Sequence, residues 1–235
     1  MTTSPVLSVV MPVFNEIDLL RSVVDGLVRG VGAITPSFEI VLSENGSTDG
    51  SVALADDLAR ELPSVRVVHS PVADYGFALQ RGLLAARGEF MANLSVDFVD
   101  LVFLREGMRR IVDLDVVLGS KYLNPDSDRR PFLRRVPGLA FNMLAQRALR
   151  LPYLDTHGLK VFRRSAVEAT VRRCIHGGAM FDNELVVRCS RQQLRIVEIP
   201  VSVVEVRPSR TRNLGLAVRS LADLARLVVN VDRDS

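Results

Sequence analysis

The chain reads Phe-Glu-Ile-Val-Leu-Ser-Glu-Asn-Gly-Ser-Thr-Asp-Gly-Ser from Phe38 to Ser51. Its first five residues are mostly apolar and indicate a buried strand. The polar, glycine-rich residues that follow predict a turn into a helix. In open α/β sheets, acidic and amide side chains at the end of a strand lie beside the free N–H groups of the next helix and build a nucleotide pocket. This stretch therefore predicts an α/β sheet with a nucleotide site at its edge.

The same alternation of apolar runs and helical periods continues along the chain. Strands are expected at 6–13, 38–42, 65–69, 90–94, 116–120, 195–200 and 201–206, and helices at 17–31, 52–62, 78–86, 101–112, 139–149, 163–175, 181–192 and 214–231. This rhythm predicts a Rossmann-like, doubly wound and mostly parallel sheet. Right-handed crossovers then place the loops after the first, second and fourth strands on one edge. The polar, basic segment 122–137 is expected to be a mobile loop.

Composition indicates an ordinary globular protein. The chain has 235 residues, of which 48% are hydrophobic and 24% charged, enough for one sizeable domain. We expect that domain at 1–212 and a C-terminal amphipathic helix and tail at 213–235. The formal charge of +3 is mild, and no nucleic-acid partner is predicted. Cys174 and Cys189 lack metal-ligand spacing, so we expect reduced thiols in a cytoplasmic protein. No signal peptide or membrane span is predicted.

Polar residues follow three of the predicted strands. These ends read Met11-Pro12-Val13-Phe14-Asn15-Glu16, Glu44-Asn45-Gly46-Ser47-Thr48-Asp49-Gly50 and Asn93-Leu94-Ser95-Val96-Asp97. Further blocks begin at Ala86, Gly119, Asp155, Phe181, Glu198 and Arg207. In this order they resemble the family 2 glycosyltransferases of the GT-A fold, most closely the polyprenyl-phosphate (dolichyl-phosphate) mannose and glucose synthase branch. The resemblance divides the domain into a nucleotide-sugar half, 1–120, and an acceptor half, 121–212.

The resemblance implies a donor site at these strand ends. It assigns nucleotide-sugar binding to Pro12, Val13, Asn15, Glu16, Glu44, Asn45, Ser47, Ser95 and Asp97. Asp97 would hold Mg²⁺ or Mn²⁺ against the donor diphosphate, because such cations prefer oxygen ligands and neutralise the leaving group. Ser95 replaces the first aspartate of the family's Asp-x-Asp, which leaves fewer acidic ligands. Asp100 is either a further ligand or a structural residue.

Plainer interpretations apply to four residues of these blocks. Asn15 and Glu16 could cap the first helix, and Asp49 is expected to cap the second. His157 replaces a small residue of the family block and is expected to be structural.

The implied reaction is an inverting transfer of a hexose from GDP-mannose or UDP-glucose, through a transition state that resembles an oxocarbenium ion. The catalytic candidates are Asp155, Glu184, Lys121 and Arg207. A polyprenyl phosphate acceptor is already ionised and needs cations, for which the candidates are Lys121, Arg134, Arg135 and Arg207. A soluble or cell-envelope hydroxyl acceptor would instead need a general base, from Asp155, Asp182 or Glu184. Ser95 also leaves open a catalytically weak nucleotide-sugar-binding protein.

The expected C-terminal helix has one apolar face. Three uses of that face are open: packing against the domain, contact within a homodimer, and peripheral attachment to the cytoplasmic face of a membrane. Arg210 and Arg212, which precede the helix, would suit an anionic bilayer.

Overall fold

The computed structural model describes residues 4–123, 132–202 and 214–233, without the side chains of 132–139, 214–220 and 233. The strands are β1 (Leu7–Val13), β2 (Phe38–Glu44), β3 (Val65–His69), β4 (Phe90–Asn93), β5 (Val116–Ser120), β6 (Lys160–Arg163) and β7 (Ile196–Pro200). The helices are α1 (Leu20–Gly32), α2 (Ser51–Glu61), α3 (Tyr75–Ala85), α4 (Leu101–Arg110), α5 (Phe132–Leu149), α6 (Arg164–Arg173), α7 (Met180–Arg191) and α8 (Leu214–Arg233).

The strands form one sheet in the order β3-β2-β1-β4-β6-β5-β7. All neighbouring pairs are parallel except those of β6, which runs antiparallel to β4 and β5. β1 lies near the middle and is covered on both faces, and Leu7, Val9, Val10 and Met11 are fully buried. A strand buried on both faces needs apolar side chains on both, which is why its sequence is a continuous apolar run. The predicted doubly wound sheet is confirmed.

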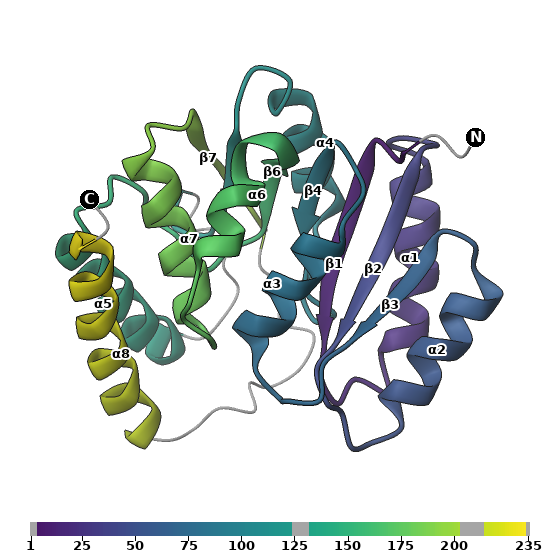
Figure 1. The fold of residues 1–235 in the computed structure, drawn as a ribbon, viewed down its shortest axis with the longest axis horizontal. Coiled ribbons are helices and arrows are strands. Elements are labelled where there is room, and N and C mark those ends of the chain that lie inside the picture. The colour runs from purple at the N-terminus through teal and green to yellow at the C-terminus, as the bar shows by residue number, and fades with distance from the viewer. Residues whose placement is uncertain (1–3, 124–131, 203–213, 234–235) are drawn as a thin grey trace.

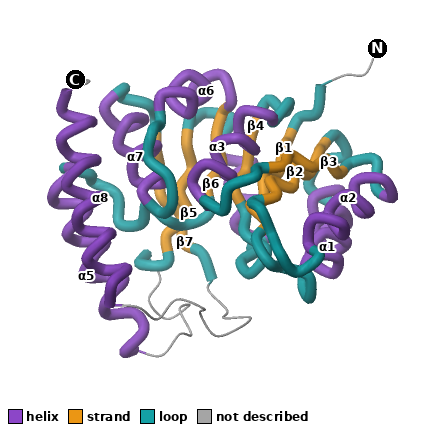
Figure 2. The backbone as a smooth tube through the Cα atoms, turned by 60° about the horizontal axis from the view of Figure 1, so that its bottom comes forward, coloured by secondary structure: helices purple, strands orange, loops and turns teal. Residues whose placement is uncertain are grey.

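Helices cover both faces of the sheet (Figure 1). Residues of α1, α2 and α4 form one apolar core with one face, and residues of α3, α6 and α7 form a second core with the other. α5 and α8 lie side by side beyond α7, at the end of the molecule away from β3 (Figure 2). The two cores hold the strands in register, so the loops at their carboxyl ends have a fixed base.

The structure differs from the expected elements at three places. No strand was expected at Lys160–Arg163, which is β6, whereas the helix expected at 163–175 is present as α6, Arg164–Arg173. The predicted loop 122–137 is helical from Phe132, while 124–131 lie outside the described residues. Pro137 lies inside α5. Because proline usually ends a helix, this helix was expected to begin only at residue 139. Val201 and Ser202 are not in a strand, and 203–206 are outside the described residues.

The apolar face of α8 packs against the protein. Leu224, Leu227 and Val231 are buried in the second core, against α7 and α5. Packing is therefore the use of this face that the structure shows. Among the described residues, no helix is long and apolar enough to cross a membrane. Cys174 and Cys189 are buried free thiols, and burial raises the pKa of both.

Candidate active site

The three predicted strand ends meet at one edge of the sheet. β1 is hydrogen-bonded to β2 on one side and β4 on the other, and Val13 lies opposite Glu44. The Asn45 N–H extends this pairing by donating to the Val13 carbonyl at 2.9 Å. The nine residues expected to bind the donor therefore lie at, or just after, the ends of the neighbouring strands β1, β2 and β4.

The loops after β1 and β2 are joined by side-chain hydrogen bonds. Asn15 adopts the left-handed conformation, with φ of 54°. Its Oδ1 accepts the Thr48 N–H at 2.8 Å, and its own N–H donates to the Ser47 Oγ at 3.0 Å. Asp49 was expected to cap α2, but the N-cap is Gly50 and has no side-chain capping bond; the Asp49 Oδ1 instead accepts the N–H of Ser51, two residues on, at 3.0 Å. These bonds fix the turn in front of the sheet edge.

Glu44 and Asn45 hold the turn that contains them. Glu44 is 2% exposed, and its two carboxylate oxygens accept the N–H groups of Ser47 at 2.7 Å and Gly46 at 3.1 Å. Burial alone would raise the pKa of Glu44, but these hydrogen bonds hold it below its ordinary value. The Asn45 Oδ1 accepts the Asp74 N–H at 2.7 Å. Both side chains thus order the turn, and their expected contact with a nucleoside stays a prediction.

The end of β4 places one carboxylate in solvent. Ser95 and Phe98 form a tight turn through two backbone hydrogen bonds, and Asp97 is exposed within it. Asn93 is buried, and among the described residues its Oδ1 has no hydrogen-bond partner. Asp100 is the N-cap of α4 and accepts the N–H of Val102, so the structure shows its structural role.

A metal site made of protein ligands alone is not present in the described part of the chain. No group of three or more His, Cys, Asp or Glu residues is placed to hold an ion there. Asp97 offers one anionic oxygen ligand, and Ser95, half-buried two residues earlier, offers a neutral one. This pair fits a cation only if the donor supplies further oxygen ligands.

Lys121 and Asp155 come together as an ion pair at the end of β5. The Lys121 Nζ lies 3.1 Å from the Asp155 Oδ2, and Asp155 is 1% exposed. Glu198 accepts the Asp155 N–H at 2.8 Å, and burial raises the pKa of Glu198 above its ordinary value. Gly158 allows the close approach of this segment to β5, since an added Cβ would lie 1.9 Å from the Gly119 carbonyl oxygen. Glu198 and the close packing of the Gly158 segment against β5 therefore fix Asp155 beside Lys121.

A second, deeper ion pair joins β6 to α7. The Lys160 Nζ lies 2.6 Å from the Asp182 Oδ1, and both side chains are almost fully buried. Burial would raise the pKa of Asp182, but the charges of Lys160 and His157 hold it below its ordinary value. Burial, with the Asp182 charge, raises the pKa of the Tyr75 hydroxyl. The His157 Nδ1 lies 3.9 Å from the Asp182 Oδ2, and its Nε2 lies 3.2 Å from the Asn183 Nδ2.

This buried network includes Lys160, Tyr75 and Asn93, for which no role was predicted. Lys160 closes the block that begins at Asp155, so the family pattern could have indicated it. Nothing in the sequence distinguished Tyr75, because only the fold brings α3 beside α7. The Asn93 position, just before Ser95, was visible as a strand end but not as a buried unpaired acceptor.

Glu184 lies elsewhere on α7. Its Oε2 accepts the N–H groups of Ile175 and His176, and its Oε1 accepts the Arg188 Nε at 2.8 Å. Residues two apart on a helix point in nearly opposite directions, so Glu184 faces away from Asp182. These contacts give Glu184 a structural role and do not support the catalytic one. The remaining predicted cations cannot be placed: Arg207 and the side chains of Arg134 and Arg135 are outside the described residues.

Residues 8–171 match the protein-family model described as "Glycosyl transferase family 2". The chain is 32% identical over 201 residues to "Glycosyltransferase AglD" of Haloferax volcanii, an alignment that covers 83% of this chain and 32% of the relative. The chain thus spans about a third of the length of that relative. It is 25% identical to a "Dolichyl-phosphate beta-glucosyltransferase" of Dictyostelium discoideum, over 94% of this chain and 73% of the relative.

Two solved structures have a similar fold. Glucosyl-3-phosphoglycerate synthase from Mycobacterium tuberculosis, crystallised with Mn²⁺, UDP and glucosyl-3-phosphoglycerate, has a TM-score of 0.69 and 20% identity, covering 96% of this chain and 79% of that one. The mannosyltransferase PcManGT from Pyrobaculum calidifontis, crystallised with GDP-Man and Mn²⁺, has a TM-score of 0.66 and 19% identity, covering 100% and 66%. At these identities the likeness concerns the fold.

Proposed function

Since the chain belongs to glycosyl transferase family 2, we propose that it transfers a hexose from GDP-mannose or UDP-glucose to polyprenyl phosphate. The observation that carries this choice of acceptor is that each candidate carboxylate near the sheet edge has a lysine partner. Lys121 lies 3.1 Å from Asp155, and Lys160 lies 2.6 Å from Asp182. A carboxylate that already holds a cation is poorly placed to take a proton from an acceptor hydroxyl. This arrangement favours an acceptor that is already ionised.

The donor would bind across the ends of β1, β2 and β4. Asp97 would hold Mg²⁺ or Mn²⁺, with the donor diphosphate supplying the other anionic ligands, and the bound cation would neutralise charge on the leaving diphosphate. The Asn93 Oδ1 is a buried acceptor without a partner among the described residues, and a sugar or ribose hydroxyl would satisfy it. The similar folds crystallised with Mn²⁺ and UDP or GDP-Man support this placement.

The acceptor phosphate would lie near Lys121, which is 20% exposed at the end of β5. Arg134, Arg135 and Arg207 are the further cations that we propose for it. The name of the dolichyl-phosphate relative supports a lipid-phosphate acceptor.

Peripheral contact with the cytoplasmic face of a membrane is part of the same proposal. The apolar face of α8 packs against the protein, so other side chains would have to contact the membrane. Four apolar side chains of α5 and α8 are exposed and could do so: Met143, Leu144, Leu221 and Val229. Flotation of the purified chain with anionic vesicles tests this contact, and no flotation would contradict it. A homodimer through the same surface is the other use of these side chains, and it would give a concentration-dependent mass in solution.

A transfer assay with two matched acceptors tests the proposed reaction. The chain is incubated with Mn²⁺, labelled GDP-mannose or UDP-glucose, and either polyprenyl phosphate or the corresponding polyprenol. We expect a labelled lipid product only with the phosphate. Label in the polyprenol or in a soluble alcohol would favour the hydroxyl acceptor. Donor binding without transfer to any acceptor would favour the weak binding protein that Ser95 suggests.

A further inference from the structure

Asp74 lies between the turn after β2 and the segment before α7, which are far apart in the sequence. It is the N-cap of α3, and its Oδ1 accepts the Phe77 N–H at 2.9 Å. Its backbone N–H donates to the Asn45 Oδ1 at 2.7 Å, in the turn after β2. The same Oδ1 accepts the Gly178 N–H at 2.8 Å, 104 residues further along the chain. Asp74 therefore joins the expected donor turn to the segment before α7.

This segment packs closely on the start of α3. A Cβ added to Gly177 would lie 2.4 Å from the Asp74 Oδ2, and one added to Gly76 would lie 2.7 Å from the Gly178 carbonyl oxygen. Gly178 has φ of 53°, a left-handed conformation that glycine adopts at little steric cost. A side chain at Gly76 or Gly177 would displace backbone or the Asp74 carboxylate, so the sequence is suited to this close contact.

The segment before α7 is also fixed to α7 itself. The Glu184 Oε2 accepts the N–H groups of Ile175 and His176. The N-cap of α7, Ala179, makes no side-chain capping bond. Asp74 instead places a carboxylate near this end of the helix, where the helix dipole favours negative charge. The hold of Asp74 on the segment is therefore also a hold on the start of α7.

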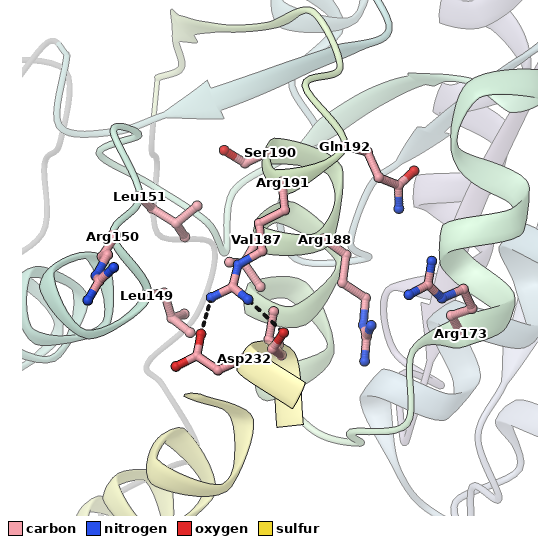
Figure 3. Close-up of a pocket in the computed structure, with 11 residues that line it drawn as sticks. Leu149, Arg150, Leu151, Arg173, Val187, Arg188, Ser190, Arg191, Gln192 and Asp232 are labelled. Atoms are coloured by element: carbon pink, nitrogen blue, oxygen red, sulfur yellow. Dashed lines mark hydrogen bonds and ion pairs between the residues drawn. The ribbon is translucent and has the colours of Figure 1, made fainter. Parts of the chain in front are cut away.

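The other end of α7 is held separately. Arg191, its last residue, donates to the Asp232 carboxylate and to the Val231 carbonyl of α8 (Figure 3). Asp182, near the start of α7, belongs to the buried ion pair with Lys160. A helix rises about 1.5 Å per residue, so roughly 14 Å of α7 separates Asp182 from Arg191. The position of Asp182 therefore depends on how the start of α7 is held.

We propose that Asp74 is a positioning residue that couples occupation of the donor site to the start of α7, where Asp182 lies. A nucleotide bound at the strand ends would make the Asn45 turn more rigid, and with it the start of α3 and the bond from Gly178 to Asp74. Binding that makes one part of a protein rigid can in this way order another part. This inference rests on the proposed donor site.

Amide hydrogen exchange with and without saturating UDP or GDP and Mn²⁺ tests the coupling, because exchange reports local opening. Two segments are compared, the turn 44–50 and the segment 175–181. In the wild-type chain we expect the nucleotide to slow exchange in both, by about threefold or more at 175–181, which is the scale of one hydrogen bond.

Asp74→Ala separates the two halves of the connection. It keeps the backbone N–H that donates to Asn45 and removes the acceptor of the Gly178 N–H. Slowing of exchange by nucleotide should therefore remain at 44–50 and be lost at 175–181. Asp74→Asn retains a side-chain oxygen that can accept both N–H groups and should restore the slowing at 175–181.

The matched control is Asp100→Ala. Asp100 is the N-cap of α4, and its carboxylate also accepts an N–H from a distant segment, that of Ser202, at 3.2 Å. Its loss should destabilise the fold to a similar extent but leave the slowing at 175–181 in place.

Three results would overturn the inference while the donor site stands: slowing at 175–181 that persists in Asp74→Ala, slowing there that is lost in Asp100→Ala as well, or slowing in the wild-type chain at 44–50 alone. No slowing at either segment of the wild-type chain would contradict the proposed donor site, and the inference with it.

Discussion

Replacing Lys160 by methionine should destabilise the protein far more than breaking an exposed ion pair of the same length. Lys160 and Asp182 are 1% and 2% exposed in their side chains and lie 2.6 Å apart. Removing one partner leaves a buried charge without its counter-ion, which costs about 3–5 kcal/mol. Arg21 and Glu61 lie 2.8 Å apart but are 45% and 53% exposed. Arg21→Met should therefore lower the free energy of unfolding much less than Lys160→Met does.

Urea unfolding followed by circular dichroism measures both free energies. A double variant, Lys160→Met with Asp182→Leu, also removes the carboxylate that Lys160→Met leaves without a counter-ion. It should recover part of the lost free energy of unfolding. The pH dependence gives a further signature: without Lys160, burial should raise the pKa of Asp182, so the deficit should grow as pH rises from about 4 to 7. A loss below about 1 kcal/mol in Lys160→Met, or a double variant no more stable than the single one, would refute this reasoning.

Three further changes have defined outcomes. Gly158→Ala should lower the free energy of unfolding by about 1–3 kcal/mol or more, because its Cβ would meet the Gly119 carbonyl at 1.9 Å; thermal unfolding no different from wild type would contradict the close packing. Burial would raise the pKa of Glu39, but its hydrogen bonds with Arg66 and Ser8 lower it, so stability should fall as pH drops below about 4.5, and Glu39→Gln should flatten this acid limb in urea titrations. Ser95→Asp should tighten Mn²⁺ binding in the presence of nucleotide, measured by calorimetry, and an unchanged affinity would argue against metal contact at this position.

The parallel part of the sheet could be predicted because each of its strands can be recognised from its own short stretch of sequence. The apolar run that became β1 and the polar turns after β1, β2 and β4 predicted that these strand ends meet at one edge of the sheet, as they do. β6 was not predicted because it has only four residues and begins with a charged one, Lys160. The ion-pair partner of Lys160, Asp182, is 22 residues away in the sequence. A buried lysine looks like a surface residue until the fold supplies its counter-ion.

Side-chain roles at the site were harder to predict than positions. Glu184 belongs to a block that the family pattern marks, yet its carboxylate is bound by backbone N–H groups and Arg188 on the far side of α7. The sequence gives the helix and the acid but not the face that the acid occupies. Glu44 is similar, since its carboxylate orders its own turn. These contacts depend on backbone geometry, which residue identity alone does not specify.

The central claim is that the edge formed by β1, β2 and β4 is a metal-dependent nucleotide-sugar site. Its most direct test is the calorimetric affinity for GDP and UDP with and without Mn²⁺, in the wild-type chain and in Asp97→Asn. Asp97 is exposed, so the variant should fold normally. We predict that Mn²⁺ tightens nucleotide binding by the wild-type chain about tenfold or more and has no such effect on the variant. Equal effects of Mn²⁺ on both proteins, or no nucleotide binding by either, would contradict the claim.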